Sequence, residues 1–347
     1  MTKQIELLEM LERTENQRAA RRSFIRLCGG AAAMTGGLAL LSACDDDDDD
    51  DDALTPTPTP TPISSSDAQD IAVLSFALQL EYLEGNYYSY AVTGAGIPAA
   101  LQAGVGSQGA VIPGTGNGAA RAVTFGDPVI AQYAREIAAD ELAHITFLRT
   151  ALGSAAPAQP TINLSGSASV TTPSGAAVGA FTAAARAAGV IGPNDIFDPF
   201  LNDQTFLIGS YLLTDVGVSA YRGSARLITN KTFLEASAGI LATECYHDGV
   251  IRSALYSRGL TVPSIFTDIQ RISDTRDGLD GPTDTDQGIG TAGNANLVPT
   301  DGNGLVLGRT APQVLNIVYQ NAAAGTTAGG FYPAGVNGSI RATVANN

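Results

Sequence analysis

The feature that most constrains this chain is a sequence pattern that occurs twice, 103 residues apart. Residues 137–152 read IAADELAHITFLRTAL, and residues 240–255 read ILATECYHDGVIRSAL. In both segments, apolar residues recur at steps of three and four, which predicts an amphipathic helix. Each apolar face also carries Glu-x-x-His, with Glu141 before His144 and Glu244 before His247. Because residues i and i+3 project from one side of a helix, the pattern predicts two carboxylates and two imidazoles in a shared core.

These four side chains are candidate metal ligands. The chain has two histidines, both in this pattern, and six glutamates after residue 43. Uncompensated charges are very costly to bury, and a pair of divalent cations removes that cost. Carboxylate oxygens combined with imidazole nitrogens suit iron or manganese, so we expect two Fe or Mn ions. The alternative is a core in which these groups bond only to one another.

Two further helices complete a predicted four-helix bundle. The first begins near Ser66, where Ser66 to Gln69 has the spacing of a capping box, and its apolar stripe includes Glu81. The repeated helices begin at Asp127 and after residue 230, and end at Gly153 and Gly259. The second additional helix, which lies between the two repeated helices in the chain, spans about 202–228.

The rest of the chain lacks long periodicity. Residues 92–126 and about 154–200 read as irregular connections, with a short helix near 180–188. Residues 261–347 are rich in Gly, Asp, Asn and Thr, and a short helix is expected from Pro312 to about Gln320. We therefore expect an all-α fold: a bundle over residues 66–260, with long irregular insertions and a coil-rich C-terminal extension that wraps it.

The N-terminal region predicts export. Residues 1–43 have a basic start and a short apolar stretch, which is typical of a signal peptide, and Arg21-Arg22 resembles a twin-arginine signal. Leu41 to Cys44 resembles a bacterial lipobox, in which Cys44 is acylated. Residues 44–65, with an Asp run and a Thr-Pro repeat, predict an extended tether. We expect a membrane-anchored lipoprotein of the bacterial cell envelope, on the periplasmic side or the cell surface; the alternative is an ordinary signal with a chance cysteine.

Charge and cysteine content exclude other classes. The formal net charge is −15, so a phosphate backbone would repel the chain and nucleic acid is excluded as a partner. Three cysteines cannot form a disulfide framework. After residue 43, no apolar stretch is long enough to span a bilayer.

Di-iron and di-manganese bundles take one carboxylate from each of two helices and Glu-x-x-His from each of the other two. Glu81 fits the first carboxylate position, with Glu84 as a secondary candidate one turn on. On the third helix the candidate is Asp215, for which two interpretations stay open: a metal ligand, or a buried acid bonded to Tyr or Arg. Tyr88 and Tyr221 are candidate donors to metal-bound carboxylates.

At this point the chain resembles a known family, the ferritin-like superfamily, and within it the exported desiccation-related proteins. The resemblance covers roughly residues 66–345. The segments that carry it are LSFALQLEYLEGNYYSYA (74–91), DVGVSAYRGSA (215–225), AGILATECYHDGVIR (238–252), DGLDGPTDTDQGI (277–289), RTAPQVLNIVY (309–319) and GGFYPAGVNGSI (329–340).

The resemblance implies redox chemistry at the metal site: oxidation of Fe(II), or disproportionation or reduction of peroxide, in oxidative or desiccation stress. The competing hypothesis is a non-catalytic envelope scaffold or binding protein without metal. Iron storage in a closed cage is a third hypothesis, which the tether and the long insertions disfavour. A homo-oligomer is compatible with the sequence, which leaves the oligomeric state open.

Overall fold

A computed structural model describes residues 68–345 of the chain. The predicted signal peptide, Cys44, the tether and the capping residue Ser66 lie outside these residues. Among the described residues, no helix combines the length and the apolar character that a bilayer span requires.

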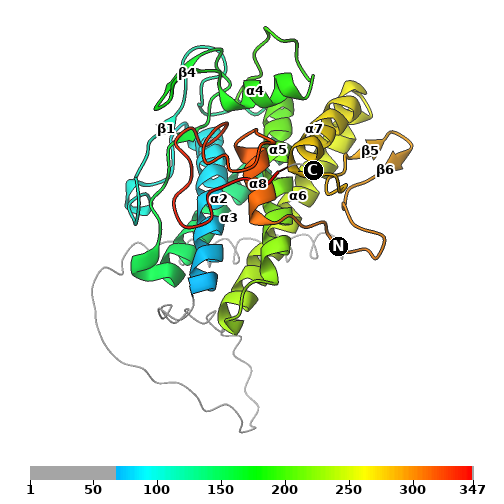
Figure 1. Ribbon diagram of the computed structural model, residues 1–347. Coiled ribbons are helices and arrows are strands. Elements are labelled where there is room, and N and C mark those ends of the chain that lie inside the picture. Colours follow the sequence, from blue (N-terminus) through cyan, green and yellow to red (C-terminus); the bar gives the residue numbers. More distant parts are fainter. Residues whose placement is uncertain (1–67, 346–347) are drawn as a thin grey trace, which may run out of the picture. The chain divides into compact units, whose positions relative to one another are not determined.

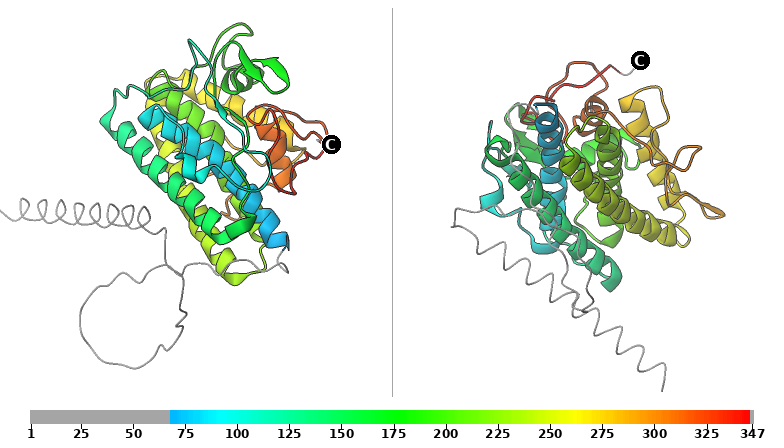
Figure 2. Two further views of the ribbon diagram at one scale, coloured as in Figure 1. Left: turned by 90° about the vertical axis from the view of Figure 1, so that its left-hand side faces the viewer. Right: turned by 90° about the horizontal axis from the view of Figure 1, so that it is seen from below.

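Four long helices form the bundle that the sequence predicts (Figures 1 and 2). Helix α2 packs against α3 and α5, and α6 packs against α5 and α3. The bounds of the four helices are α2 Ala68–Thr93, α3 Pro128–Leu152, α5 Asp203–Ala225 and α6 Lys231–Gly259.

Capping residues set the helix ends near the predicted positions. The Asp127 side chain accepts a hydrogen bond from the Val129 amide at 2.9 Å, and Pro128 follows as the first helical residue. Asn202 caps α5 in the same way through the Thr205 amide at 3.1 Å. Such caps satisfy backbone amides that have no partner inside the helix.

Helices α2 and α5 form the centre of the described region. Every residue from 73 to 89 and from 206 to 221 is buried. By contrast, α3 and α6 each keep an exposed face, as amphipathic helices do. The outer sides of α2 and α5 are covered by chain segments outside the bundle, and one such contact is a hydrogen bond from the Tyr332 hydroxyl to the Gln79 carbonyl at 2.7 Å.

The long connections carry short elements. Strands β1 and β2 pair in parallel, whereas β3 with β4 and β5 with β6 form antiparallel pairs. The predicted short helix near residue 180 is present as α4. The bounds are η1 Ala99–Leu101, β1 Val111–Ile112, η2 Gly153–Ala155, β2 Ile162–Asn163, β3 Val170–Thr172, β4 Gly175–Ala177, α4 Ala180–Ala187, β5 Gly290–Thr291 and β6 Asn294–Ala295.

The C-terminal region contains two helices, of which the sequence analysis predicted only one. Helix α8, Ala311–Val318, is the expected short helix, and it begins with a capping box of Thr310 and Gln313. Helix α7, Ser264–Asp280, was not predicted. Its buried side has only three isoleucines and then an arginine, Arg276, so its apolar pattern is short. Helix α7 packs on α6 and α8, and α8 also packs on α5. A Cβ at Gly223 of α5 would lie 1.9 Å from the Arg309 carbonyl oxygen, so only glycine allows this close approach.

Candidate metal centre

The repeated helices and α2 bring the predicted carboxylates and imidazoles to one place inside the bundle. His144 Nδ1 lies 3.4 Å from Glu81 Oε2 and 3.3 Å from Glu244 Oε1. His247 Nδ1 lies 3.3 Å from Glu141 Oε1, and the two imidazole centres are 6.1 Å apart. One ligand atom each from Glu81, Glu141, His144 and Glu244 lies within 4.8 Å of the others.

Most polar atoms of this cluster lack hydrogen-bond partners, although they are buried. Within residues 68–345, the unpaired atoms include Glu81 Oε2, Glu84 Oε2, both oxygens of Glu141 and of Glu244, and Nδ1 of His144 and His247. Buried polar groups almost always have partners, so a set of unpaired atoms that face one another requires an explanation. Carboxylate oxygens and imidazole nitrogens are a donor set that fits iron or manganese. The residues present therefore fit a bound metal.

Electrostatics favour positive charge in this cluster. Burial raises the pKa of Glu81 to about 8, although His144 opposes the shift. Burial also acts to raise the pKa of Glu141, but His144 and His247 lower it more, so that this pKa lies below its ordinary value. Burial acts to lower the pKa of His247, yet Asp140, Glu141 and Glu244 raise it to about 12. A divalent cation would compete with the protons on these ligands.

Two polar side chains support the cluster from outside. The Tyr221 hydroxyl donates a hydrogen bond to Glu81 Oε1, as predicted for this tyrosine. Tyr88, the other predicted donor, instead shares a hydrogen bond of 2.7 Å with the Thr214 hydroxyl. The sequence analysis missed Asp140, whose Oδ2 lies 3.2 Å from His247 Nε2. The signal available for Asp140 was its position directly before Glu141 in the repeated pattern.

Asp140 is placed to orient His247. A carboxylate that accepts from one ring nitrogen leaves the lone pair of the other free for a metal. We expect Asp140→Asn to weaken metal binding by roughly 10- to 100-fold, because an amide stabilises the imidazole orientation less well. Titration of the metal-free protein with Mn²⁺ or Fe²⁺ measures this. Asp274→Asn, which changes an exposed acid on α7, is the control; equal affinities for the two variants would contradict a positioning role for Asp140.

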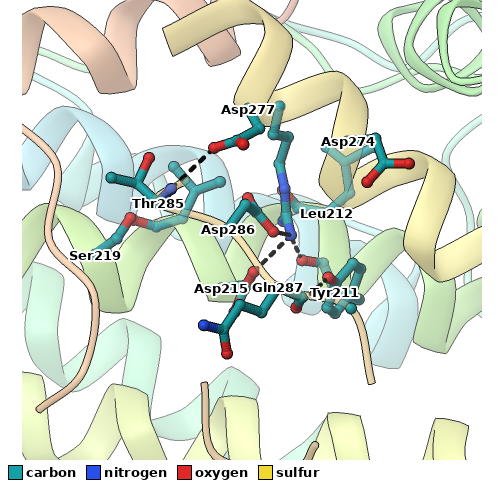
Figure 3. A network of polar contacts seen from close by, with 12 residues as sticks. Tyr211, Leu212, Asp215, Ser219, Asp274, Asp277, Thr285, Asp286 and Gln287 are labelled. Atoms are coloured by element: carbon teal, nitrogen blue, oxygen red, sulfur yellow. Dashed lines mark hydrogen bonds and ion pairs between the residues drawn. The ribbon is translucent and has the colours of Figure 1, made fainter. Parts of the chain in front are cut away.

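The structure does not place Asp215 in the cluster, which corrects its assignment as a candidate ligand. Asp215 Oδ1 lies 3.2 Å from Arg252 Nη1, and its Oδ2 lies 2.5 Å from Arg276 Nη2. The second interpretation, an acid bonded to arginine on a neighbouring helix, describes this arrangement. Asp215 and Asp286 lie with Tyr211 around one guanidinium group in Figure 3.

Asp215 belongs to a buried ion-pair network that joins the bundle to the C-terminal region. Arg276 of α7 also binds Asp286 at 2.7 Å, and Arg309 binds the other oxygen of Asp286 at 2.8 Å. Arg309 also binds Asp280 at the end of α7. The sequence analysis assigned no role to Arg276, Asp280, Asp286 or Arg309, because the members of the network are far apart in the chain.

A small cavity reaches the cluster from the side of α8. Glu84 and Gly217 line it at the cluster end. Its other walls are apolar side chains of α2, α5 and α8, and Phe331. The C-terminal region therefore forms part of the wall.

Comparison with known proteins agrees with this geometry. The ferritin-like domain family matches residues 69–257. The chain is 26% identical over 287 residues to the ferritin-like catalase Nec2 of Nesocodon mauritianus. The aligned region covers 79% of this chain and 85% of that protein. It is 28% identical over 262 residues to the desiccation-related protein PCC13-62 of Craterostigma plantagineum. This second aligned region covers 71% of this chain and 76% of that protein.

No solved structure matches the chain in the same comparison. The family match spans more than half of the chain and includes all three helices that carry the cluster. It confirms the resemblance inferred from the sequence: this chain belongs to the ferritin-like domain family.

Proposed function

We propose that this protein is a di-metal oxidoreductase that disproportionates hydrogen peroxide with two Fe or Mn ions held by the carboxylate and histidine cluster. The observation that carries the proposal is the set of buried, unpaired oxygen and nitrogen atoms that face one another between α2, α3 and α6. The similarity to a relative named a ferritin-like catalase supports the choice of reaction. Glu81, Glu141, His144, Glu244 and His247 would hold the ions.

In this reaction one peroxide molecule is oxidised to dioxygen and another is reduced to water, so no external reductant is needed. When bound, the two ions would supply the redox chemistry of this exchange. The protein supplies the rest: Tyr221 holds Glu81 by a hydrogen bond, and Asp140 orients His247. Because the cluster is buried, its charges act on a bound molecule with little screening by water.

The cavity beside Glu84 favours a small, uncharged substrate. Its walls are apolar apart from Glu84, which is the one charged side chain among the described residues that line it. A charged molecule would lose its hydration there without compensation, whereas hydrogen peroxide is neutral and close to water in size. Peroxide is therefore a better fit to this cavity than a larger hydroperoxide.

Metal analysis combined with a peroxide assay tests the proposal. The full chain, produced with iron and manganese in excess, is expected to contain two ions per chain and to release dioxygen from hydrogen peroxide. Chelation should abolish turnover, metal addition should restore it, and tert-butyl hydroperoxide should react more slowly. A protein that stays metal-free, or a loaded protein that consumes no peroxide, would reject the proposal. Oxidation of Fe(II) without peroxide consumption would favour the ferroxidase hypothesis.

We also propose that the protein is exported and anchored to the bacterial cell envelope through a lipid on Cys44, where it protects against oxidative or desiccation stress. Arg21-Arg22, the lipobox-like segment before Cys44 and the acidic Thr-Pro tether support this location. Similarity to a relative named a desiccation-related protein supports the stress role. Membrane fractionation of wild-type protein and Cys44→Ser tests the anchor, and equal amounts of both in the membrane would exclude it.

A further inference from the structure

Helix α5 meets the cluster at a glycine. A Cβ built on Gly217 would lie 2.8 Å from Glu84 Oε1 and 3.5 Å from Glu244 Oε2. Real Cβ atoms do not approach other atoms so closely, so the Glu84 carboxylate occupies the space that a side chain at position 217 would need. The rule for di-metal bundles expects a carboxylate from this helix. In this chain α5 instead leaves room for a carboxylate that comes from α2.

The two glutamates of the repeated pattern divide the cluster into two halves. Glu141 has Oε1 3.3 Å from His247 Nδ1 and Oε2 3.8 Å from His144 Nδ1. Glu244 has Oε1 3.3 Å from His144 Nδ1 and Oε2 3.9 Å from His247 Nδ1. Each of these carboxylates therefore turns one oxygen toward each imidazole, as a carboxylate that bridges two ions would.

The half at His144 has a further carboxylate of its own, because Glu81 Oε2 lies 3.4 Å from His144 Nδ1. Glu84 lies one turn further along α2 and is 6% exposed, and its Oε2 has no hydrogen-bond partner. The Cβ position at Gly217 lies close to both Glu84 Oε1 and Glu244 Oε2, and Glu244 Oε2 is the oxygen of that carboxylate that faces His247. Glu84 therefore lies beside the half of the cluster that contains His247, whereas Glu81 lies in the half that contains His144.

We propose that Glu84 and His247, with one oxygen each from Glu141 and Glu244, form a second divalent-cation position, and that Gly217 leaves the room for Glu84. This proposal rests on the proposed function, because it requires the cluster to bind metal. It places the two terminal carboxylates on one helix, as the pair Glu81 and Glu84, rather than on two helices.

Charge balance supports two positions rather than one. Four buried glutamates, Glu81, Glu84, Glu141 and Glu244, surround the two imidazoles. Two divalent cations neutralise four carboxylates, whereas one cation leaves two negative charges uncompensated in a buried site. With Glu84 included, each position would have one imidazole, one carboxylate of its own and one oxygen from each of Glu141 and Glu244.

Metal stoichiometry of the full chain tests the proposal. Wild-type protein loaded with Mn²⁺ is expected to hold two ions per chain, and its electron paramagnetic resonance spectrum should show coupling between them. Glu84→Gln, which keeps the side-chain shape, should hold one ion and lose the coupling. Glu235→Gln, an exposed position on α6, is the matched control and should hold two ions.

The possible results separate this proposal from the proposed function. A wild-type protein without metal overturns both. A wild-type protein with two coupled ions, combined with a Glu84→Gln variant that also holds two, overturns only the assignment of Glu84. A single ion in the wild type overturns the second position and leaves the first in place.

A double variant tests the role of Gly217 directly. Ordinary bond lengths place the carboxylate oxygens of an aspartate roughly 2.4 Å from its Cβ. Glu84 Oε1 lies 2.8 Å from the Cβ position of residue 217, so an aspartate at this position would place an oxygen close to that of Glu84. Glu84→Ala should hold one ion, and Glu84→Ala combined with Gly217→Asp should recover two. A folded double variant that holds one ion would overturn the inference that Gly217 occupies the position from which α5 would otherwise supply a carboxylate ligand.

Discussion

Glu141→Ala is expected to leave the protein without either ion, because this carboxylate directs one oxygen toward each imidazole. Loss of a group that only supports a ligand weakens metal binding about 10- to 100-fold, so loss of a shared ligand should exceed 100-fold for both ions. Peroxide turnover should fall to the level of the metal-free protein. Elemental analysis and oxygen evolution measure the two effects.

The same substitution should remove the stabilisation that metal binding supplies. A metal present at about 1,000 times its Kd adds about 4 kcal/mol to the free energy of unfolding. For a domain of this size, that energy corresponds to a Tm difference of roughly 8–16 °C between the loaded wild type and the variant. Glu235→Ala on α6 is the control and should keep both ions. A Glu141→Ala protein that retains two ions would contradict the bridging role.

Arg276→Leu is expected to lower the free energy of unfolding by about 3–5 kcal/mol, because it leaves buried carboxylates without their partner. Arg276 is buried and binds both Asp215 and Asp286, and it also donates to the Tyr211 carbonyl at 2.9 Å. Urea unfolding of the metal-free protein measures the effect without a contribution from metal.

Arg271→Leu provides the matched control for Arg276. Arg271 lies on the same helix and is exposed, and it donates a hydrogen bond to the Gly189 carbonyl at 2.8 Å. Its replacement should cost about 1 kcal/mol or less, as exposed polar contacts do. Equal losses for the two variants would show that the buried network does not stabilise the attachment of α7.

Local sequence patterns predicted the four bundle helices and most of the candidate ligands. Residues that cap a helix act on backbone amides within three positions, so Asp127 could be identified as a cap without knowledge of the fold. The two Glu-x-x-His pairs could also be identified, since the spacing i, i+3 already places both side chains on one face. The four helices and five of the ligand candidates follow from such short-range rules.

The choice between Asp215 and Glu84 could not be made in this way. Every residue of α5 from 206 to 221 is buried, so its apolar pattern does not distinguish the face that meets the cluster. Asp215 and Gly217 differ by two positions, which is about 200° around a helix, and they therefore face nearly opposite sides. The rotation of α5 in the bundle turns Gly217 to the cluster and Asp215 to Arg252 and Arg276.

The sequence by itself determined the four bundle helices, their approximate ends and the two Glu-x-x-His pairs, because each depends on residues within one or two helical turns. Only the tertiary structure decided that Asp140 supports His247, that Asp215 pairs with Arg276, and that Glu84 fills the space beside Gly217. Each of these contacts joins different helices, and its geometry depends on how the helices are rotated and packed against one another, which no local pattern specifies.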